Sequence, residues 1–345
     1  MEGNSCGVCG EGGPRGVTNT KQGDSETHRT LNDTKLRVSV QERTQVADGV
    51  VALTLVSADP VVALPAWSAG AHIDVFTDGD IVRQYSLCGD PKSAESYKIG
   101  VLRNAEGRGG SKFIHDEVSV GSELTIRGPR NHFELAQSDR YVFIAGGIGI
   151  TPILPMILQV KEQGAEWTLL YGGRSRSSMA FLRGLEEEGP RVVVWPQDES
   201  GVPDLHRVLG SLDSQVSIYA CGPEPLLRAV ERACQELNLA APRVERFTPV
   251  DTPSDSVDSS FVVELQQSNR IVTVGHDASI LQTLESVGVT VPFSCRQGTC
   301  GTCETAVLGG EVDHRDSILT DDEKAANDTM MICVSRGRGK LTLDL

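Results

Sequence analysis

Four cysteines near the carboxyl end of the 345-residue sequence have a spacing suited to metal chemistry. Three follow the pattern Cys-x4-Cys-x2-Cys, and the fourth comes after 29 intervening residues; the four are Cys295, Cys300, Cys303 and Cys333. Four thiolates can hold the two irons of a [2Fe–2S] cluster, and this spacing is known for such clusters. Gly298 and Gly301 lie within the pattern and would let backbone N–H groups approach sulfur. The pattern therefore predicts an iron–sulfur centre.

A structural zinc site or a set of buried free thiols would also account for four cysteines. Zinc sites more often use two separate Cys-x2–4-Cys pairs, whereas here three cysteines share one loop. The sequence has nine cysteines but no basic region followed by an apolar core at its start, so we expect a cytoplasmic protein without a disulfide framework. Cys6 and Cys9 form a further Cys-x2-Cys pair, which we interpret as incidental because no second pair accompanies it.

A second group of residues could hold a phosphate and an aromatic ring system. Arg83, Tyr85 and Ser86 lie on one predicted strand and offer a guanidinium fork, an aromatic face and a hydroxyl. Further along, glycines followed by a hydroxyl stand at the start of a predicted helix and could cradle a phosphate; they are Gly109, Gly110 and Ser111. Taken alone, an exposed strand and an ordinary helix cap would explain the same residues.

A third group suits a pyrophosphate. One glycine turn joins an apolar strand to a helix, and it contains Gly146, Gly147, Gly149 and Thr151. A similar turn, Cys221-Gly222-Pro223, follows a later strand. Backbone amides at a helix start can approach a pyrophosphate closely, although close strand–helix packing would also require glycines here. Cys221 could equally be a small buried hydrophobe, and Arg174 could accept a 2′-phosphate.

The elements that must position these groups change in type along the chain. After residues 1–33, which we expect to form a disordered tail, short alternating runs with turn residues between them predict an antiparallel β-barrel over 34–138; the runs are Leu36–Val40, Val50–Val56, His72–Phe76, Val82–Leu87, Tyr97–Leu102 and Glu123–Ile126. Strands then alternate with helices over 139–250, which predicts an α/β domain with a parallel sheet. Residues 251–258 are predicted to be a linker, and 259–345 to be a third domain that begins with a hairpin.

Composition limits the function further. The formal net charge of −15 argues against a nucleic-acid partner and against docking on anionic lipid, and we attribute it to solubility. The uncharged run Tyr141–Leu158 has 18 residues, but its glycines and prolines would break a membrane-spanning helix. We therefore expect a protein that does not enter the membrane.

The cysteine segment carries a family resemblance. PFSCRQGTCGTCETAVLGGEVDHRDSIL, with MMICVSRG after it, resembles the ferredoxin domain of the phthalate dioxygenase reductase family, and in particular its vanillate demethylase reductases. The resemblance extends from about Leu36 to the end and implies a flavin barrel, a nicotinamide domain and a β-grasp ferredoxin domain. It implies that Cys295 and Cys300 hold the outer iron, and Cys303 and Cys333 the inner one.

The same resemblance implies FMN as the flavin and assigns further residues. The FMN site would include Arg83, Tyr85, Ser86 and the glycine run above, and also Gly100, Val101 and Arg103. Phe247 would lie against the flavin. The two glycine turns and Arg174 would bind the nicotinamide cofactor, which is NADH in most of the family, with NADPH left open. Ser86 and Cys221 would lie at the site of hydride transfer.

The function implied is electron transfer from NADH through FMN and the [2Fe–2S] cluster to a separate oxygenase component of a Rieske non-haem iron system. A reductase for a haem monooxygenase is the nearest alternative, because similar modules serve both. A non-catalytic iron–sulfur redox sensor belongs to a different class, and the paired flavin and nicotinamide motifs argue against it. We expect the reductase to be a monomer.

Overall fold

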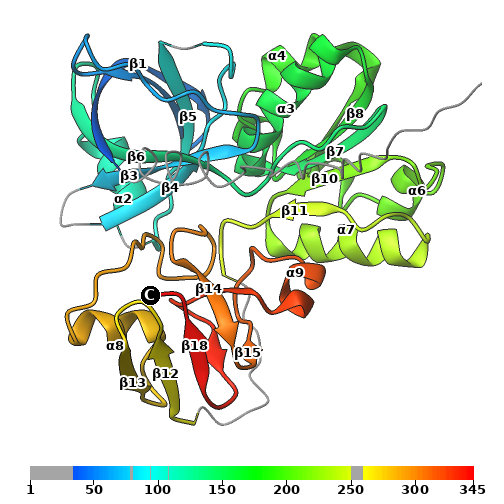
Figure 1. Ribbon diagram of the computed structural model, residues 1–345. Helices are drawn as coiled ribbons and strands as arrows, with labels where there is room; N and C mark the ends of the chain where they lie inside the picture. Colours follow the sequence, from blue (N-terminus) through cyan, green and yellow to red (C-terminus); the bar gives the residue numbers. More distant parts are fainter. Residues whose placement is uncertain (1–33, 78–80, 94, 108, 250–258) are drawn as a thin grey trace, which may run out of the picture.

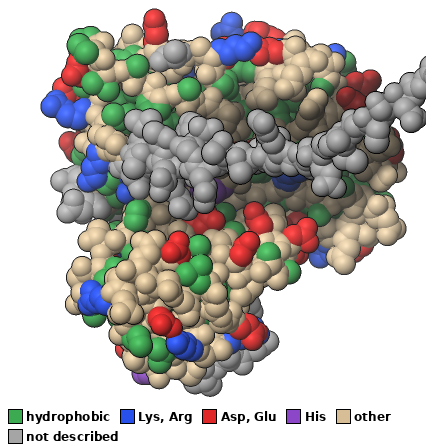
Figure 2. Space-filling model, viewed as in Figure 1, with side chains coloured by type: hydrophobic (Ala, Val, Ile, Leu, Met, Phe, Trp, Pro, Cys, Tyr) green, Lys and Arg blue, Asp and Glu red, His purple; other side chains and the backbone are tan. Residues whose placement is uncertain are grey.

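The computed structural model describes residues 34–77, 81–93, 95–107, 109–249 and 259–345. The expected disordered tail over 1–33, with Cys6 and Cys9, and the expected linker over 251–258 lie outside the described residues. Figure 1 shows a barrel and an α/β sheet next to each other, with a third domain below them. Figure 2 shows acidic side chains gathered on the visible face of this third domain. The predicted multidomain fold class is confirmed.

The first domain is a six-stranded antiparallel barrel with the order β4-β3-β6-β1-β2-β5. Its strands are β1 (Lys35–Ala47), β2 (Val50–Ser57), β3 (Ala71–Thr77), β4 (Ile81–Ser86), β5 (Ser96–Leu102) and β6 (Glu123–Asn131). A bridge between Leu87 and Ile99 closes the sheet. The alternating apolar residues of β1 and β2, such as Val38 and Leu53, are buried inside. One helix, α2 (Gly110–Asp116), follows β5.

The second domain has a parallel five-stranded sheet with the order β11-β10-β7-β8-β9. Its strands are β7 (Arg140–Gly146), β8 (Glu166–Gly173), β9 (Val192–Pro196), β10 (Ser217–Cys221) and β11 (Arg243–Glu245). Its helices are α3 (Ile150–Gln163), α4 (Leu182–Glu186), α5 (Gln197–Ser200), α6 (Leu205–Leu209) and α7 (Glu224–Glu236), with short 3₁₀ turns at η2 (Gly147–Gly149), η3 (Arg176–Ser178) and η4 (Gly189–Arg191). Chain order reverses between β7 and β10, and a crevice for ligands forms at such a point in α/β sheets.

The run Tyr141–Leu158 forms the buried strand β7 and the start of α3, as its glycines and prolines predict. Within the described ranges, no helix has the length and apolar character needed to cross a membrane.

The third domain is a mixed five-stranded sheet with the order β13-β12-β18-β14-β16. Its strands are β12 (Phe261–Leu265), β13 (Arg270–Val274), β14 (Glu304–Gly309), β16 (Thr329–Met331) and β18 (Leu341–Leu343), and β15 (Val312–Asp313) pairs with β17 (Arg336–Gly337). Strands β12 and β18 are parallel and the other pairs antiparallel, which is the predicted β-grasp pattern. Helix α8 (Ile280–Ser286) covers the sheet, and α9 (Asp321–Ala326) precedes β16.

Candidate flavin, nicotinamide and iron–sulfur sites

One cavity lies where the three domains meet. Its lining combines residues of the barrel, of the segment after β11 and of the cysteine loop: His72, Val82, Arg83, Gln84, Ser86, Glu245, Arg246, Phe247, Cys295, Gln297 and Thr299. Residues predicted for the flavin site and for the cluster, which lie far apart in the sequence, therefore reach one place. Of the predicted site residues, the cavity collects Arg83, Ser86, Phe247 and Cys295.

The predicted flavin phosphate site joins β4 to the start of α2. The Arg83 side chain passes over Gly110 so closely that a Cβ at position 110 would lie 2.5 Å from Arg83 Cγ. Gly109 has φ +97°, a conformation that favours glycine. Ser111 Oγ accepts a hydrogen bond from the backbone N–H of Asn104 at 3.0 Å. A guanidinium fixed beside a glycine turn is the arrangement that a flavin phosphate requires, so these residues fit FMN.

Two aromatic groups add to this fit. The Tyr85 hydroxyl is buried and has no hydrogen-bond partner among the described residues, and burial raises the pKa of this phenol. A buried hydroxyl without a partner is costly, so a ligand group that pairs with it would remove that cost. Phe247 is 42% exposed although it is a large apolar side chain on the cavity wall. An aromatic ring left uncovered there suits stacking against a flavin ring.

The three residues assigned on β5 and just after it have other contacts. Gly100 faces the α/β domain, where a Cβ would lie 2.9 Å from Thr151 Cγ2. Val101 is buried in the barrel core, and Arg103 forms an ion pair with Asp116 of α2. None of the three lines the cavity, so their role in FMN binding stays a prediction.

The two glycine turns lie together at the carboxyl ends of β7 and β10. Cys221 pairs with Ala145 in the parallel register, and a Cβ on Gly222 would lie 2.9 Å from Gly146 Cα. A Cβ on Gly149 would collide with the carbonyl oxygen of Cys221. These three glycines therefore permit close packing of one turn on the other, which is the structural explanation that the sequence left open.

Gly147 differs from its neighbours. It has φ +55°, and nothing lies within 4 Å of where its Cβ would be. Open space over a glycine amide suits the approach of a pyrophosphate. Thr151, by contrast, donates its hydroxyl hydrogen bond to Ile148 O at 2.9 Å, and Pro223 occupies the position before α7.

The two arginines after β8 have different surroundings. Arg176 forms ion pairs with Glu186 and Glu199. Arg174 is exposed, and within the described ranges no hydrogen bond or ion pair engages its side chain. Arg174 is therefore the arginine available to a ribose or a 2′-phosphate, and the choice between NADH and NADPH stays a prediction.

Glu245 is a site residue that the sequence analysis missed. Ser86 Oγ donates to Glu245 Oε2 at 3.4 Å, and Cys221 Sγ lies 3.9 Å from the same oxygen. Burial raises the pKa of the Glu245 carboxyl to about 8, while hydrogen bonds from Ser86 and Cys221 lower it. Burial and the nearby carboxyl also raise the pKa of the Cys221 thiol, which is therefore neutral. The Glu245 carboxyl, which is mostly protonated at neutral pH, thus connects Ser86 and Cys221, the two residues predicted at the hydride-transfer site.

No sequence pattern marked Glu245. It ends β11, a strand of only three residues without apolar alternation, and its neighbour Cys221 reaches it through the parallel pairing of β10 and β11. One signal could have pointed to Glu245: it lies directly before Arg246 and Phe247, and the family resemblance places Phe247 against the flavin.

The four predicted cluster cysteines are each at most 8% exposed. Two backbone N–H groups of the loop point at Cys295 Sγ, from Gln297 at 3.2 Å and from Thr299 at 3.4 Å. The loop turns through positive φ at Arg296, Gly298 and Gly301, which makes it tight. Backbone donors aimed at a buried sulfur fit a thiolate that carries cluster charge.

The arrangement is less suited to zinc. Among the residues that the structure describes, no three His, Cys, Asp or Glu side chains are arranged to hold a single metal ion. A tetrahedral zinc site would need four such ligands around one point, whereas a [2Fe–2S] cluster distributes its four thiolates over two irons. The two backbone N–H groups aimed at Cys295 Sγ fit a thiolate of the binuclear cluster.

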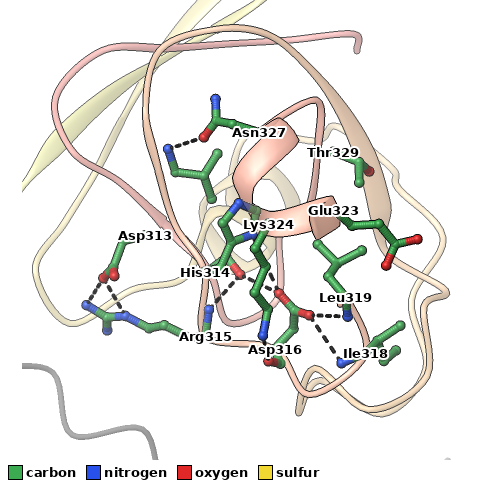
Figure 3. Close-up of polar contacts among 12 residues, drawn as sticks. Asp313, His314, Arg315, Asp316, Ile318, Leu319, Glu323, Lys324, Asn327 and Thr329 are labelled. Atoms are coloured by element: carbon green, nitrogen blue, oxygen red, sulfur yellow. Dashed lines mark hydrogen bonds and ion pairs between the residues drawn. The ribbon is translucent and has the colours of Figure 1, made fainter. Parts of the chain in front are cut away.

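A rigid turn supports the cysteine loop from the side of α9 (Figure 3). Asp316 Oδ2 accepts hydrogen bonds from the backbone N–H groups of Ile318 at 3.2 Å and Leu319 at 2.9 Å. Ser317, the residue after Asp316, donates its N–H to Gly298 O at 2.9 Å. A Cβ on Gly298 would lie 3.0 Å from Asp316 Cα. The turn therefore fixes the middle of the loop and requires glycine at position 298.

Comparisons with known proteins identify the domains that carry these candidate sites. Residues 263–337 match the family model of the 2Fe-2S iron-sulfur cluster binding domain, and 143–232 match the oxidoreductase NAD-binding domain. Phenoxybenzoate dioxygenase subunit beta of Ectopseudomonas oleovorans is 44% identical over 82% of this chain and 89% of its own length. Vanillate O-demethylase oxidoreductase of Pseudomonas sp. (strain HR199 / DSM 7063) is 37% identical over 90% of this chain and 100% of its own.

Two solved structures have the same architecture. An intact type IV self-sufficient cytochrome P450 monooxygenase matches with TM-score 0.84 and 43% identity, and the match covers 90% of this chain but only 41% of that one. Phthalate dioxygenase reductase matches with TM-score 0.65 and 33% identity over 90% of this chain and 98% of its own. The protein is an oxidoreductase with NAD-binding and [2Fe–2S] domains and a flavin barrel for FMN, and it belongs to the phthalate dioxygenase reductase family of oxygenase reductases.

Proposed function

We propose that this chain is the reductase component of a Rieske non-haem iron oxygenase system in the cytoplasm, and that it delivers electrons from NADH to a separate oxygenase component. The cavity shared by three domains supports this proposal most directly, because residues predicted for the flavin site and the cluster ligand Cys295 line it together with Glu245, which contacts Cys221 of the predicted nicotinamide site. The curated relatives are themselves named as subunits of oxygenase systems.

The residues around the cavity have different roles in the proposed electron transfer, according to their position. When bound, FMN supplies the exchange between a two-electron hydride and single electrons, which the [2Fe–2S] cluster takes one at a time. Arg83 and the turn at Gly109 would hold the flavin phosphate, and Phe247 would cover the ring. Glu245 holds Ser86 and Cys221 in place across the barrel and the α/β domain. Cys295 would bring the cluster to the cavity wall.

The visible spectrum of the purified protein under anaerobic NADH, with NADPH in a parallel sample, tests the electron path. We expect flavin bands and broad iron–sulfur absorption, and NADH should bleach both. A protein that stays colourless after reconstitution with iron, sulfide and FMN would contradict the proposal. A rate of NADH-dependent cytochrome c reduction would separate an enzyme from a redox sensor, which has no turnover.

The structural match to a self-sufficient P450 favours one alternative, a haem monooxygenase as electron acceptor. Mixing the NADH-reduced protein with a purified Rieske oxygenase component and, separately, with a ferric haem monooxygenase distinguishes the two. Faster reoxidation by the Rieske component supports the proposal, and faster reoxidation by the haem protein supports the alternative.

A further inference from the structure

A buried carboxylate of the flavin barrel carries an unusual number of charged partners. Asp74 on β3 is fully buried. Its Oδ2 accepts from Arg127 Nη2 at 2.8 Å and Nε at 3.0 Å, and it pairs with Arg130 Nη2 at 2.8 Å. Both arginines come from β6, the strand that pairs with β3. Through its Oδ2 atom, Asp74 therefore links strands β3 and β6 within the barrel.

The other oxygen of Asp74 accepts a hydrogen bond from Gln84 Nε2 of the barrel at 3.2 Å and also has a partner outside the barrel. Ser294 Oγ, from the ferredoxin domain, donates to Asp74 Oδ1 at 2.8 Å. Arg127 Nη2 also reaches across and donates to the carbonyl oxygen of Phe293 at 2.7 Å. Phe293 and Ser294 directly precede Cys295, so the crossing bonds end on the backbone and side chain next to a predicted cluster ligand.

A second contact extends from the end of the same strand. His132 follows β6 and lies so close to Gly301 that a Cβ there would collide with its imidazole ring. Gly301 stands between Cys300 and Cys303. Strand β6 and the residue after it therefore touch the cysteine loop at its start and in its second half.

We propose that Asp74 and Arg127 are positioning residues for electron transfer to the cluster, and that they fasten the start of the cysteine loop to the flavin barrel. The proposal rests on the proposed function, because it assigns these residues to the step between the flavin and the cluster. Charge-assisted hydrogen bonds are short and roughly twice as strong as neutral ones, so they suit a contact that must fix a loop to within a fraction of an ångström. The ferredoxin domain is joined to the barrel here by polar bonds rather than by a shared apolar core.

Three variants separate the crossing bonds from the barrel's own ion pair. Ser294→Ala removes the two crossing bonds of the Ser294 hydroxyl, to Asp74 and from Gln84, and leaves Asp74 with both arginines. Arg127→Lys keeps the charge beside Asp74 but cannot form the fork that reaches Phe293 O. Asp74→Asn tests the centre of the network directly; if it fails to fold, the other two still decide. Glu123→Gln is the matched control, because Glu123 is an exposed ion-pair residue on the same strand.

The experiment follows anaerobic reduction of the holoprotein by NADH in a stopped-flow instrument, with freeze-quench EPR for the cluster. We expect flavin bleaching at the wild-type rate in all variants. Cluster reduction should slow about threefold in Ser294→Ala and about tenfold or more in Arg127→Lys, because small displacements of a reacting group cost large factors in rate. Hydrogen exchange at the amides of residues 293–299 should quicken in the same order, and Glu123→Gln should match wild type in both measurements.

Wild-type rates of cluster reduction in both Ser294→Ala and Arg127→Lys would overturn the proposal, and so would unchanged hydrogen exchange over 293–299. Failure of NADH to reduce the flavin in the wild-type protein would instead overturn the proposed function, while the exchange measurement would still report whether the loop is fastened.

Discussion

Glu245 shows how one residue can join two domains at the predicted site of hydride transfer. It lies on the last position of β11 and contacts Ser86, 159 residues earlier in the chain, and Cys221 on the neighbouring strand. A carboxyl whose pKa is raised to about 8 is mostly protonated at neutral pH and can donate a hydrogen bond. The nicotinamide and the flavin ring are expected to meet beside a neutral acid rather than a fixed charge.

The raised pKa of Glu245 predicts a pH dependence of stability. Between about 4.5 and about 8 the folded protein keeps a proton that the unfolded chain has released, so the free energy of unfolding falls as pH rises through this window. In Glu245→Gln this loss is absent. We expect the variant to match wild type near pH 5 and to be more stable above pH 8, by on the order of a few kcal/mol.

Urea unfolding at pH 5, 7 and 9 measures this difference. Parallel pH profiles for wild type and Glu245→Gln would show that the carboxyl titrates in the folded protein as it does in the unfolded one. Ser86→Ala, which removes a hydrogen bond but no titrating group, should keep the wild-type slope and serves as the control.

Cys300 allows a test of the cluster assignment in which one sulfur atom is replaced by oxygen. In Cys300→Ser we expect loss of the iron–sulfur absorption and EPR signal and loss of cytochrome c reduction, because a hydroxyl does not replace a thiolate ligand. NADH-dependent reduction of ferricyanide through the flavin should persist. Cys234→Ser changes a buried thiol of the α/β domain and should keep both activities. A Cys300→Ser protein with an intact cluster signal would remove Cys300 from the ligand set.

At the scale of elements, the proposed flavin phosphate site depends on how β4 and α2 meet. The helix starts at Gly110 directly under Arg83, so the absence of one Cβ decides where the guanidinium lies. The same geometry explains why neither the strand motif nor the glycine run was specific alone, since each supplies half of one site.

We therefore predict that Gly110→Ala weakens FMN binding by roughly tenfold, equivalent to the loss of about one charge-assisted hydrogen bond, by displacing Arg83. Arg83→Ala should weaken it at least as much. Gly184→Ala is the control, because this helical glycine in α4 has nothing within 4 Å of an added Cβ. Flavin fluorescence titration of the apoprotein gives the three dissociation constants, and equal values for Gly110→Ala and Gly184→Ala would contradict the assignment.

At the scale of the whole molecule, one apolar core joins the first two domains, whereas the ferredoxin domain has a separate core. One core combines barrel residues, such as Val50 and Phe133, with the sheet and helix α3 of the α/β domain. The ferredoxin domain has a core of its own, which includes Cys303 and Cys333 and no residue from the other domains. The first two domains should therefore unfold together, and the ferredoxin domain separately.

This division predicts the effect of metal removal. Stripping the cluster leaves buried thiols without their metal and should lower the unfolding temperature of the ferredoxin transition, because metal binding to the folded state alone is folding free energy. The transition of the flavin and nicotinamide domains should move by less than about 2 °C, given the small change expected for an uncoupled unit of that size. Differential scanning calorimetry with flavin fluorescence distinguishes the two transitions, and a single joint shift would show that the domains unfold as one.

The sequence determined the local features of this protein by itself. Alternation of apolar residues predicted all six barrel strands, because burial of one face imposes a period of two on each strand. The cysteine spacing and its glycines predicted a tight loop whose backbone N–H groups approach sulfur, and the loop has two such contacts to Cys295 Sγ. The family followed from the resemblance of the cysteine segment, and both the family and the multidomain fold class are confirmed by the comparisons.

Only the tertiary structure decided which groups meet. Asp74 and Ser294 are 220 residues apart, and the bond between them leaves no periodic signal in either segment. The structure also shows that the glycines have different roles. Gly146, Gly149 and Gly222 permit close packing of the two turns, whereas nothing lies within 4 Å of where a Cβ of Gly147 would be. Periodicity reports the burial of each element, whereas a site between domains depends on long-range packing that no local pattern records.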